Sequence, residues 1–146
     1  MLTLPTVAAP VAAYVPALVD GDRVWVSGQL PFVAGELPAT GPVGTGEGLV
    51  PVEDAARLAR IAALNAVAAV RSVVGDLDRV ARIVKVIGFV ASGPEFTGQP
   101  AVVNGASLLL QEVFGDAGVH ARSAVGVVAL PLGSPVEIEL VAALHA

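Results

Sequence analysis

The chain has 146 residues, of which 55% are hydrophobic and only 14% are charged, and it contains no cysteine. This length and even composition predict a single domain over residues 1–146, and the missing cysteines exclude disulfides and thiolate nucleophiles. The net charge of −5, with only eight scattered lysines and arginines, argues against nucleic acid as a partner. The apolar excess predicts subunit interfaces.

The N-terminal stretch carries no charged side chain before Asp20. Pro5, Pro10 and Pro16 would interrupt a membrane-spanning helix. A secretory signal begins with a positively charged region, and no lysine or arginine precedes this stretch. We therefore expect a cytoplasmic protein with no membrane partner.

Two valine-rich runs, residues 14–18 and 23–27, flank an Asp-Gly-Asp turn at 20–22 and predict a β-hairpin. The stretch from 31 to 51 is rich in glycine and proline, which predicts a long loop with little regular structure. Ordered loops of this length often lie near a functional site.

A helix is predicted from Pro51 to Val74, with acidic residues in its first turn and Gly75 after its end. Apolar side chains recur along it at helical spacing, at Leu58, Ile61, Leu64, Val67, Ala68 and Val74. One face of this helix should therefore pack on a sheet.

The segment from Val80 to Val90 predicts a strand, because it is apolar and rich in β-branched residues. Strict alternation would place Ile83, Lys85, Ile87 and Phe89 on one face and Val84, Val86 and Gly88 on the other. Neither face is strongly polar, so we expect both to be covered.

A second helix is predicted over 100–114, followed by strands over 121–130 and 136–143 that a proline-bounded turn joins. The resulting order, ββαβαββ, predicts an α+β fold with a mixed or antiparallel sheet. Two helices cannot surround five strands, so they should cover one face and leave the other for a second layer, such as neighbouring sheets in a trimer.

Four segments resemble the Rid (reactive intermediate deaminase) family in their order and approximate spacing. They are Val26-Ser27-Gly28-Gln29-Leu30-Pro31, His120-Ala121-Arg122-Ser123-Ala124-Val125, Leu130-Pro131 and Val136-Glu137-Ile138-Glu139. Three further segments, at 75–80, 88–92 and 104–107, resemble a less characterised branch with a lengthened first loop. The resemblance covers nearly the whole chain.

This resemblance implies a homotrimer built like the chorismate mutase barrel, with a cleft at each subunit boundary. It implies that small 2-imino or enamine acids bind there and are hydrolysed to 2-keto acids and ammonia, with no cofactor.

Arg122 matches the family's arginine for the substrate carboxylate, and a planar guanidinium offers two parallel donors that fit this role. Glu137 matches the acid that activates water. Glu139 should share a strand face with Glu137, so either could be a base. Without the motif, an arginine or glutamate in a strand would more often be solvated or ion-paired.

Tyr14 matches a tyrosine that holds the carboxylate beside the arginine, and Ser27 could donate its hydroxyl to the ligand. The resemblance also implies that the backbone carbonyl of Ala124, where many relatives have cysteine, accepts a hydrogen bond from the substrate nitrogen. The alternative is that Tyr14 is a packing residue and Ser27 an ordinary strand end.

His120 and His145 are the only histidines and lack the spacing of a metal site, so we expect no metal, and a structural role for His120. Lys85 is interpreted as a stem packed beneath a solvated ammonium rather than a Schiff-base lysine. The glycines of 41–48 lack the Lys-Ser/Thr ending of a phosphate loop.

The leading hypothesis is cofactor-free hydrolysis of imino acids with Arg122, Tyr14 and Glu137. The alternative is a trimer that binds small carboxylate metabolites without turnover, and a third possibility is a structural assembly. The sequence does not fix the substrate, because the pocket depends on loop 32–50 and on a neighbouring chain.

Overall fold

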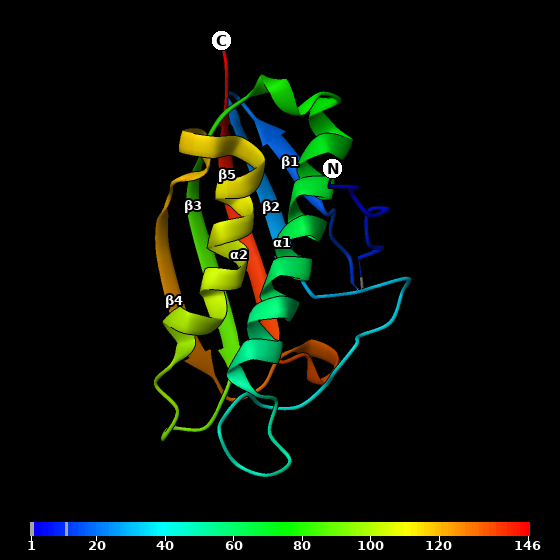
Figure 1. Cartoon of the computed structure of the whole chain (residues 1–146). Coiled ribbons are helices and arrows are strands. Elements are labelled where there is room, and N and C mark those ends of the chain that lie inside the picture. Colours follow the sequence, from blue (N-terminus) through cyan, green and yellow to red (C-terminus); the bar gives the residue numbers. More distant parts are fainter. Residues whose placement is uncertain (1, 11) are drawn as a thin grey trace.

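Five strands form one sheet in the spatial order β1-β2-β5-β3-β4 (Figure 1). Their bounds are Ala17–Asp20 for β1, Arg23–Gln29 for β2, Val80–Ala91 for β3, Ala121–Val127 for β4 and Val136–Leu144 for β5. Neighbours pair antiparallel except β3 and β4, which run parallel. The computed structural model describes residues 2–10 and 12–146, and its ββαβαββ order confirms the predicted α+β class.

Two long helices, α1 at Val52–Val74 and α2 at Gln99–Phe114, cover the same face of the sheet (Figure 1). Short 3-10 helices lie at Leu77–Arg79, Gly115–Gly118 and Pro131–Gly133. Helix α1 ends at Gly75, whose φ of 84° is a conformation that side chains disfavour. Within the described ranges, no helix is long and apolar enough to cross a bilayer.

The helices pack closely because small side chains line their contact. Ala59, Ala62 and Ala66 of α1 are completely buried. A Cβ atom on Gly105 of α2 would lie only 1.9 Å from the carbonyl oxygen of Ala56. The predicted packing face was therefore partly wrong: alanines form much of it, and Ile61 and Leu64 are only partly buried.

Strand β3 does not alternate strictly. Its register with β5 shifts between Ile83 and Lys85, and both Ile83 and Val86 are fully buried. This irregularity places Ile83 on the helix face, so the prediction that it shares a face with Lys85 was wrong. A bulge adds one residue to a strand and inverts the faces beyond it.

Two predicted strands were too long. Strand β1 begins at Ala17, so Tyr14 lies in a bend before the hairpin, and β4 ends at Val127 rather than at 130. The Gly-Asp turn and the hairpin are confirmed, with Asp20 opposite Arg23. The 31–51 segment is the predicted long loop and contains only isolated bridges.

Among the residues that the structure describes, no layer covers the sheet face opposite the helices. Leu18 and Trp25 pair in register there and are 49% and 50% exposed. Val125 on β4 is also exposed and lies opposite Phe89 of β3. This uncovered face therefore exposes apolar side chains to solvent.

Candidate functional site

Glu137 projects from β5 onto the uncovered face of the sheet. Its neighbours Val136 and Ile138 are buried on the helix side, so alternation turns the carboxylate the other way. Glu139, two residues further along, shares that face and is also partly buried. The strand therefore presents two carboxylates on one face, as predicted.

Gly28 on β2 makes room for Glu137. The register between β2 and β5 shifts between Val26 and Gln29, and Gly28 lies within this irregularity. A Cβ atom on Gly28 would lie 2.7 Å from both Cδ and Oε1 of Glu137. The glycine of the Ser-Gly-Gln motif therefore allows the carboxylate to occupy its present position.

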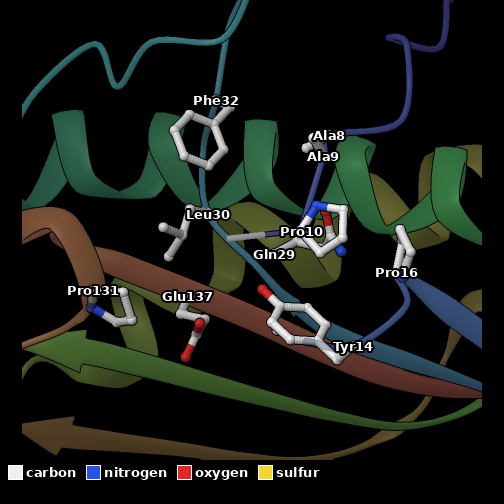
Figure 2. A pocket seen from close by; sticks show the side chains of 11 residues that line it. Ala8, Ala9, Pro10, Tyr14, Pro16, Gln29, Leu30, Phe32, Pro131 and Glu137 are labelled. Atoms are coloured by element: carbon white, nitrogen blue, oxygen red, sulfur yellow. The ribbon is translucent and has the colours of Figure 1, made fainter. Parts of the chain in front are cut away.

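A small cavity of about 40 Å³, here called the Glu137 cavity, lies beside this carboxylate. Its wall includes Tyr14, Gly28, Phe32 and Pro131. Figure 2 shows the Tyr14 hydroxyl turned toward the carboxylate of Glu137. Since one water molecule needs roughly 10–15 Å³ of such space, the cavity accommodates a few waters. The structure thus brings Tyr14 and Glu137 together.

The electrostatic surroundings of Glu137 favour its protonated form. Burial raises the pKa of this carboxyl above its ordinary value, and the charge of Glu139 raises it further. Among the described residues, no lysine or arginine forms a salt bridge with Glu137. A carboxylate whose pKa is raised is a stronger base toward a neighbouring water at neutral pH.

Ser27 precedes Gly28 but does not line the Glu137 cavity. Its Oγ donates a hydrogen bond of 2.6 Å to the carbonyl of Val15, and its backbone N–H donates one of 2.9 Å to the carbonyl of Pro16. These two bonds fasten the segment that carries Tyr14 to β2. The hydroxyl proton is thus used within the chain, and a ligand contact of Ser27 stays a prediction.

Arg122 lies on β4 and faces α2. It is paired with Val86, a fully buried residue on the helix side of β3. Its Nη1 donates to Oδ1 of Asn104 at 2.8 Å and to Oγ of Ser107 at 3.2 Å, and its Nη2 donates to the carbonyl of Pro100 at 3.4 Å. Neutral acceptors hold the guanidinium, and none of the salt bridges in the described part of the chain involves it.

Arg122 and Glu137 do not meet within one chain. Glu137 is opposite Phe89 on the uncovered face, whereas Arg122 points to the helix face. Strand β3 also separates β4 from β5, and β4 is an edge of the sheet. A site that uses both side chains must therefore take them from two copies of the chain.

The backbone of β4 offers a further acceptor near Arg122. The carbonyl of Val127 accepts a hydrogen bond of 2.9 Å from the N–H of Ser92, which follows β3. Successive residues of a strand direct their backbone groups to opposite edges, so the carbonyl of Ala124 points to the free edge of the sheet. This carbonyl is accessible to a ligand or a second chain.

Sequence reasoning missed the polar network behind Arg122. His120 donates from Nδ1 to the carbonyl of Gly118 at 2.6 Å, and its Nε2 accepts from Ser107 Oγ at 2.8 Å. Burial lowers the pKa of His120 and favours the neutral ring that this arrangement requires. The spacing of Asn104 and Ser107, three residues apart on one helix, could have indicated their shared face.

The remaining candidate side chains form no additional centre. Lys85 donates from Nζ to Ser123 Oγ at 3.4 Å on the uncovered face. Over residues 2–10 and 12–146, no group of three or more His, Cys, Asp or Glu side chains is arranged to hold a metal ion.

The fold and this arrangement define an α+β protein of the chorismate mutase-like type. Residues 1–144 match the family described as "YjgF/chorismate mutase-like, putative endoribonuclease". The chain belongs to this family, which confirms the predicted resemblance to the Rid proteins.

Proteins similar to this chain include the following three. Protein TCP17 of Trypanosoma cruzi is 44% identical over 147 residues, covering 99% of this chain and 89% of TCP17. The crystal structure of Atu1372 from Agrobacterium tumefaciens, described as having unknown function, is 44% identical with a TM-score of 0.90, covering 99% and 87% of the two chains. A crystal structure from Shewanella oneidensis, described as a putative endoribonuclease, is 34% identical with a TM-score of 0.92, covering 98% and 93%.

Proposed function

We propose that the protein hydrolyses small 2-imino or enamine acids to 2-keto acids and ammonia, without a cofactor, at clefts between the subunits of a homotrimer. The observation that carries this proposal is Glu137, a partly buried carboxylate with a raised pKa beside a water-sized cavity. The substrate class follows from the resemblance to the Rid family.

In the proposed reaction, Glu137 removes a proton from a water molecule in the Glu137 cavity while the water oxygen attacks the imine carbon. The protonated Glu137 then returns that proton to the nitrogen of the tetrahedral adduct. The C–N bond breaks as the adduct hydroxyl loses its proton to the departing nitrogen. The products are one 2-keto acid and one ammonia, and Glu137 is again ionised.

The substrate carboxylate requires a cation and a steady position. Tyr14 lies beside Glu137 and can donate its hydroxyl. Arg122 of a neighbouring copy supplies the guanidinium fork, and the Ala124 carbonyl of that copy accepts from the substrate nitrogen. The neutral contacts of Arg122 with α2 hold the fork without cancelling its charge.

A trimer would also bury the uncovered face of the sheet. Leu18, Trp25 and Val125 expose apolar surface there, and a second sheet would bury it. The edge strand β4 would at the same time find a neighbour.

Cleavage of RNA, which appears in the description of the family, is weakly supported by this chain. Binding of RNA needs a basic surface, whereas the net charge is −5 and only eight residues are lysine or arginine. The alternative that remains is a trimer that binds small carboxylates without turnover. It uses the same Arg122 and Tyr14 but does not need Glu137 as a base.

An assay with freshly generated 2-iminopropanoate tests the proposal. An amino-acid oxidase produces the imine from alanine, and release of pyruvate is compared with the spontaneous rate. Arg122→Ala and Glu137→Gln should both abolish the acceleration, and Glu139→Gln is the matched control that should retain most of it. Rates equal to the spontaneous one with the unaltered protein would leave only the binding alternative and the structural assembly.

A further inference from the structure

A second and much larger cavity lies on the helix side of the Glu137 cavity. It occupies about 940 Å³ between the N-terminal segment at 3–10, the loop at 32–35 and the middle of α1. Figure 1 shows the N-terminal segment running alongside α1. We call this space the α1 cavity. Its volume lies in the range of pockets that bind small organic ligands, roughly 300–1,000 Å³.

The wall of the α1 cavity is mainly apolar. Ile61 and Leu64 of α1 face it, although the sequence predicted that both would pack on the sheet. Phe32, Val33 and the prolines and alanines of the N-terminal segment form the opposite wall. Core helices normally bury such side chains. Ile61 and Leu64 are only partly buried, so they are available to an apolar ligand.

One buried polar side chain, Asn65, enters this apolar wall. Asn65 is only 2% exposed, and its Nδ2 donates to the carbonyls of Leu30 at 2.9 Å and Phe32 at 3.2 Å. Its Oδ1 has no hydrogen-bond partner among the described residues, and no fully buried side-chain oxygen or nitrogen there is unpaired. Asn65 is the amide side chain in the wall of the α1 cavity, and its Oδ1 is the acceptor that it can offer to a ligand there.

The two cavities share a wall. Ala8, Ala9, Pro10 and Phe32 line both of them. In Figure 2, these residues lie on the α1 side of Tyr14 and Glu137. The α1 cavity therefore adjoins the Glu137 cavity, and a substrate side chain that reaches α1 from above Glu137 must pass Phe32 in this shared wall.

We propose that the α1 cavity receives the substrate's side chain, so that the protein selects 2-imino acids with a large apolar side chain, above all an aromatic one with a terminal hydroxyl. This inference rests on the proposed function for the position of the acid group. The ring contacts Ile61 and Leu64, and the hydroxyl donates to Oδ1 of Asn65. A small imino acid leaves this space unused.

The corresponding 2-keto acids are stable and test the inference by binding alone. Titration calorimetry compares pyruvate, phenylpyruvate and 4-hydroxyphenylpyruvate. We expect phenylpyruvate to bind roughly 10-fold to 100-fold more tightly than pyruvate, because the ring leaves water, and the hydroxyl to add about 5-fold. Equal affinity for the three acids, or no binding of the aromatic pair, overturns the inference.

Ile61→Trp places a bulky ring in the α1 cavity, where the aromatic side chain of the ligand is proposed to lie, and should weaken the preference for the aromatic acids while pyruvate binding stays unchanged. Val73→Trp adds the same side chain at an exposed position of α1, outside the cavity, and should change nothing. Unchanged aromatic binding in a folded Ile61→Trp protein contradicts the inference. The comparison of ligands on the unaltered protein stands even where that variant does not fold.

The turnover assay separates this inference from the proposed function. Hydrolysis of 2-iminopropanoate with no preference among the keto acids would refute the cavity assignment and leave the function intact. Selective binding of aromatic keto acids with no hydrolysis of any imine would support the cavity assignment and refute the function.

Discussion

Gly28 and Glu137 face each other across neighbouring strands so closely that a single methyl group on Gly28 would overlap the carboxylate, at 2.7 Å from Cδ. The position of the proposed base is therefore set by a residue that has no functional group. The backbone irregularity of β2 at this point supports the same conclusion.

Gly28→Ala should displace the Glu137 carboxylate rather than unfold the chain, because the contacted atoms are the end of a flexible side chain. We expect kcat to fall roughly 10-fold to 100-fold, since misplacing a catalytic group by an ångström has effects of this size. The melting temperature should change by a few degrees at most. Gly46→Ala adds a methyl group at ordinary contact distance from Leu49 and is the matched control.

The raised pKa of Glu137 predicts an unusual effect on stability. Folding favours the protonated carboxyl, so the ionised form costs stability once the pH exceeds the pKa of the unfolded chain, near 4.5. Glu137→Gln should therefore increase the free energy of unfolding at pH 7 and leave it nearly unchanged below pH 4. Urea unfolding across this pH range measures the difference.

Glu112→Gln is the control of opposite sign. The hydrogen bond from Arg60 holds the pKa of the exposed Glu112 carboxyl below its ordinary value of 4.5. The ionised carboxylate therefore stabilises the fold slightly at pH values above the pKa of the unfolded chain. Removing this charge should lower stability a little at pH 7. A loss of stability in both variants would contradict the account of Glu137.

Local features made much of the fold predictable. The Asp-Gly-Asp turn, the acidic first turn of α1 and Gly75 act within a few residues, so the hairpin and the bounds of α1 follow from the sequence. The irregularity near Ile83 depends on pairing between β3 and β5, which lie far apart in the chain. No local pattern reveals such a shift, and strict alternation therefore failed there.

The residues of the candidate site were more predictable from the sequence than their orientation. Tyr14 and Glu137 were identified by motif and lie at one cavity. That Arg122 faces α2, on the side of the sheet opposite Glu137, follows from strand pairing and was not accessible from the sequence. Asn104 and Ser107 were noted only as part of the branch segment 104–107, because a helical amide and hydroxyl are common on surfaces and acquire meaning only beside the arginine.

The network behind Arg122 predicts a pH effect at mildly acid pH. Burial lowers the pKa of His120, so folding favours the neutral ring, and the stability linked to it is present above about pH 6.5. That stability is lost as the pH falls through the folded pKa. The protonated ring can no longer accept from Ser107, and its charge repels Arg122.

We therefore expect binding of pyruvate, measured by calorimetry, to weaken as the pH falls from 7 to 5. Ser107→Ala removes one acceptor of Arg122 and the link to His120. This variant should bind pyruvate roughly 3-fold to 10-fold more weakly at pH 7, as expected for one lost hydrogen bond. It should also show a flatter pH dependence. A profile identical to that of the unaltered protein would show that the network does not act on Arg122.

The opposite orientations of Arg122 and Glu137 predict that two inactive variants restore each other. Arg122→Ala chains retain the carboxylate, and Glu137→Gln chains retain the guanidinium. In a cyclic assembly each site takes one residue from either neighbour. Co-refolding equal amounts should therefore regain about a quarter of the unaltered activity, because chains occupy neighbouring positions at random.

The double variant Arg122→Ala/Glu137→Gln, mixed with the unaltered protein in the same way, is the control. Random assembly again leaves about a quarter of the sites with both residues intact. Sites within a single chain would instead keep half of the activity in this control and none in the complementation mixture. The two mixtures thus distinguish a shared site from an internal one, whatever the absolute rate.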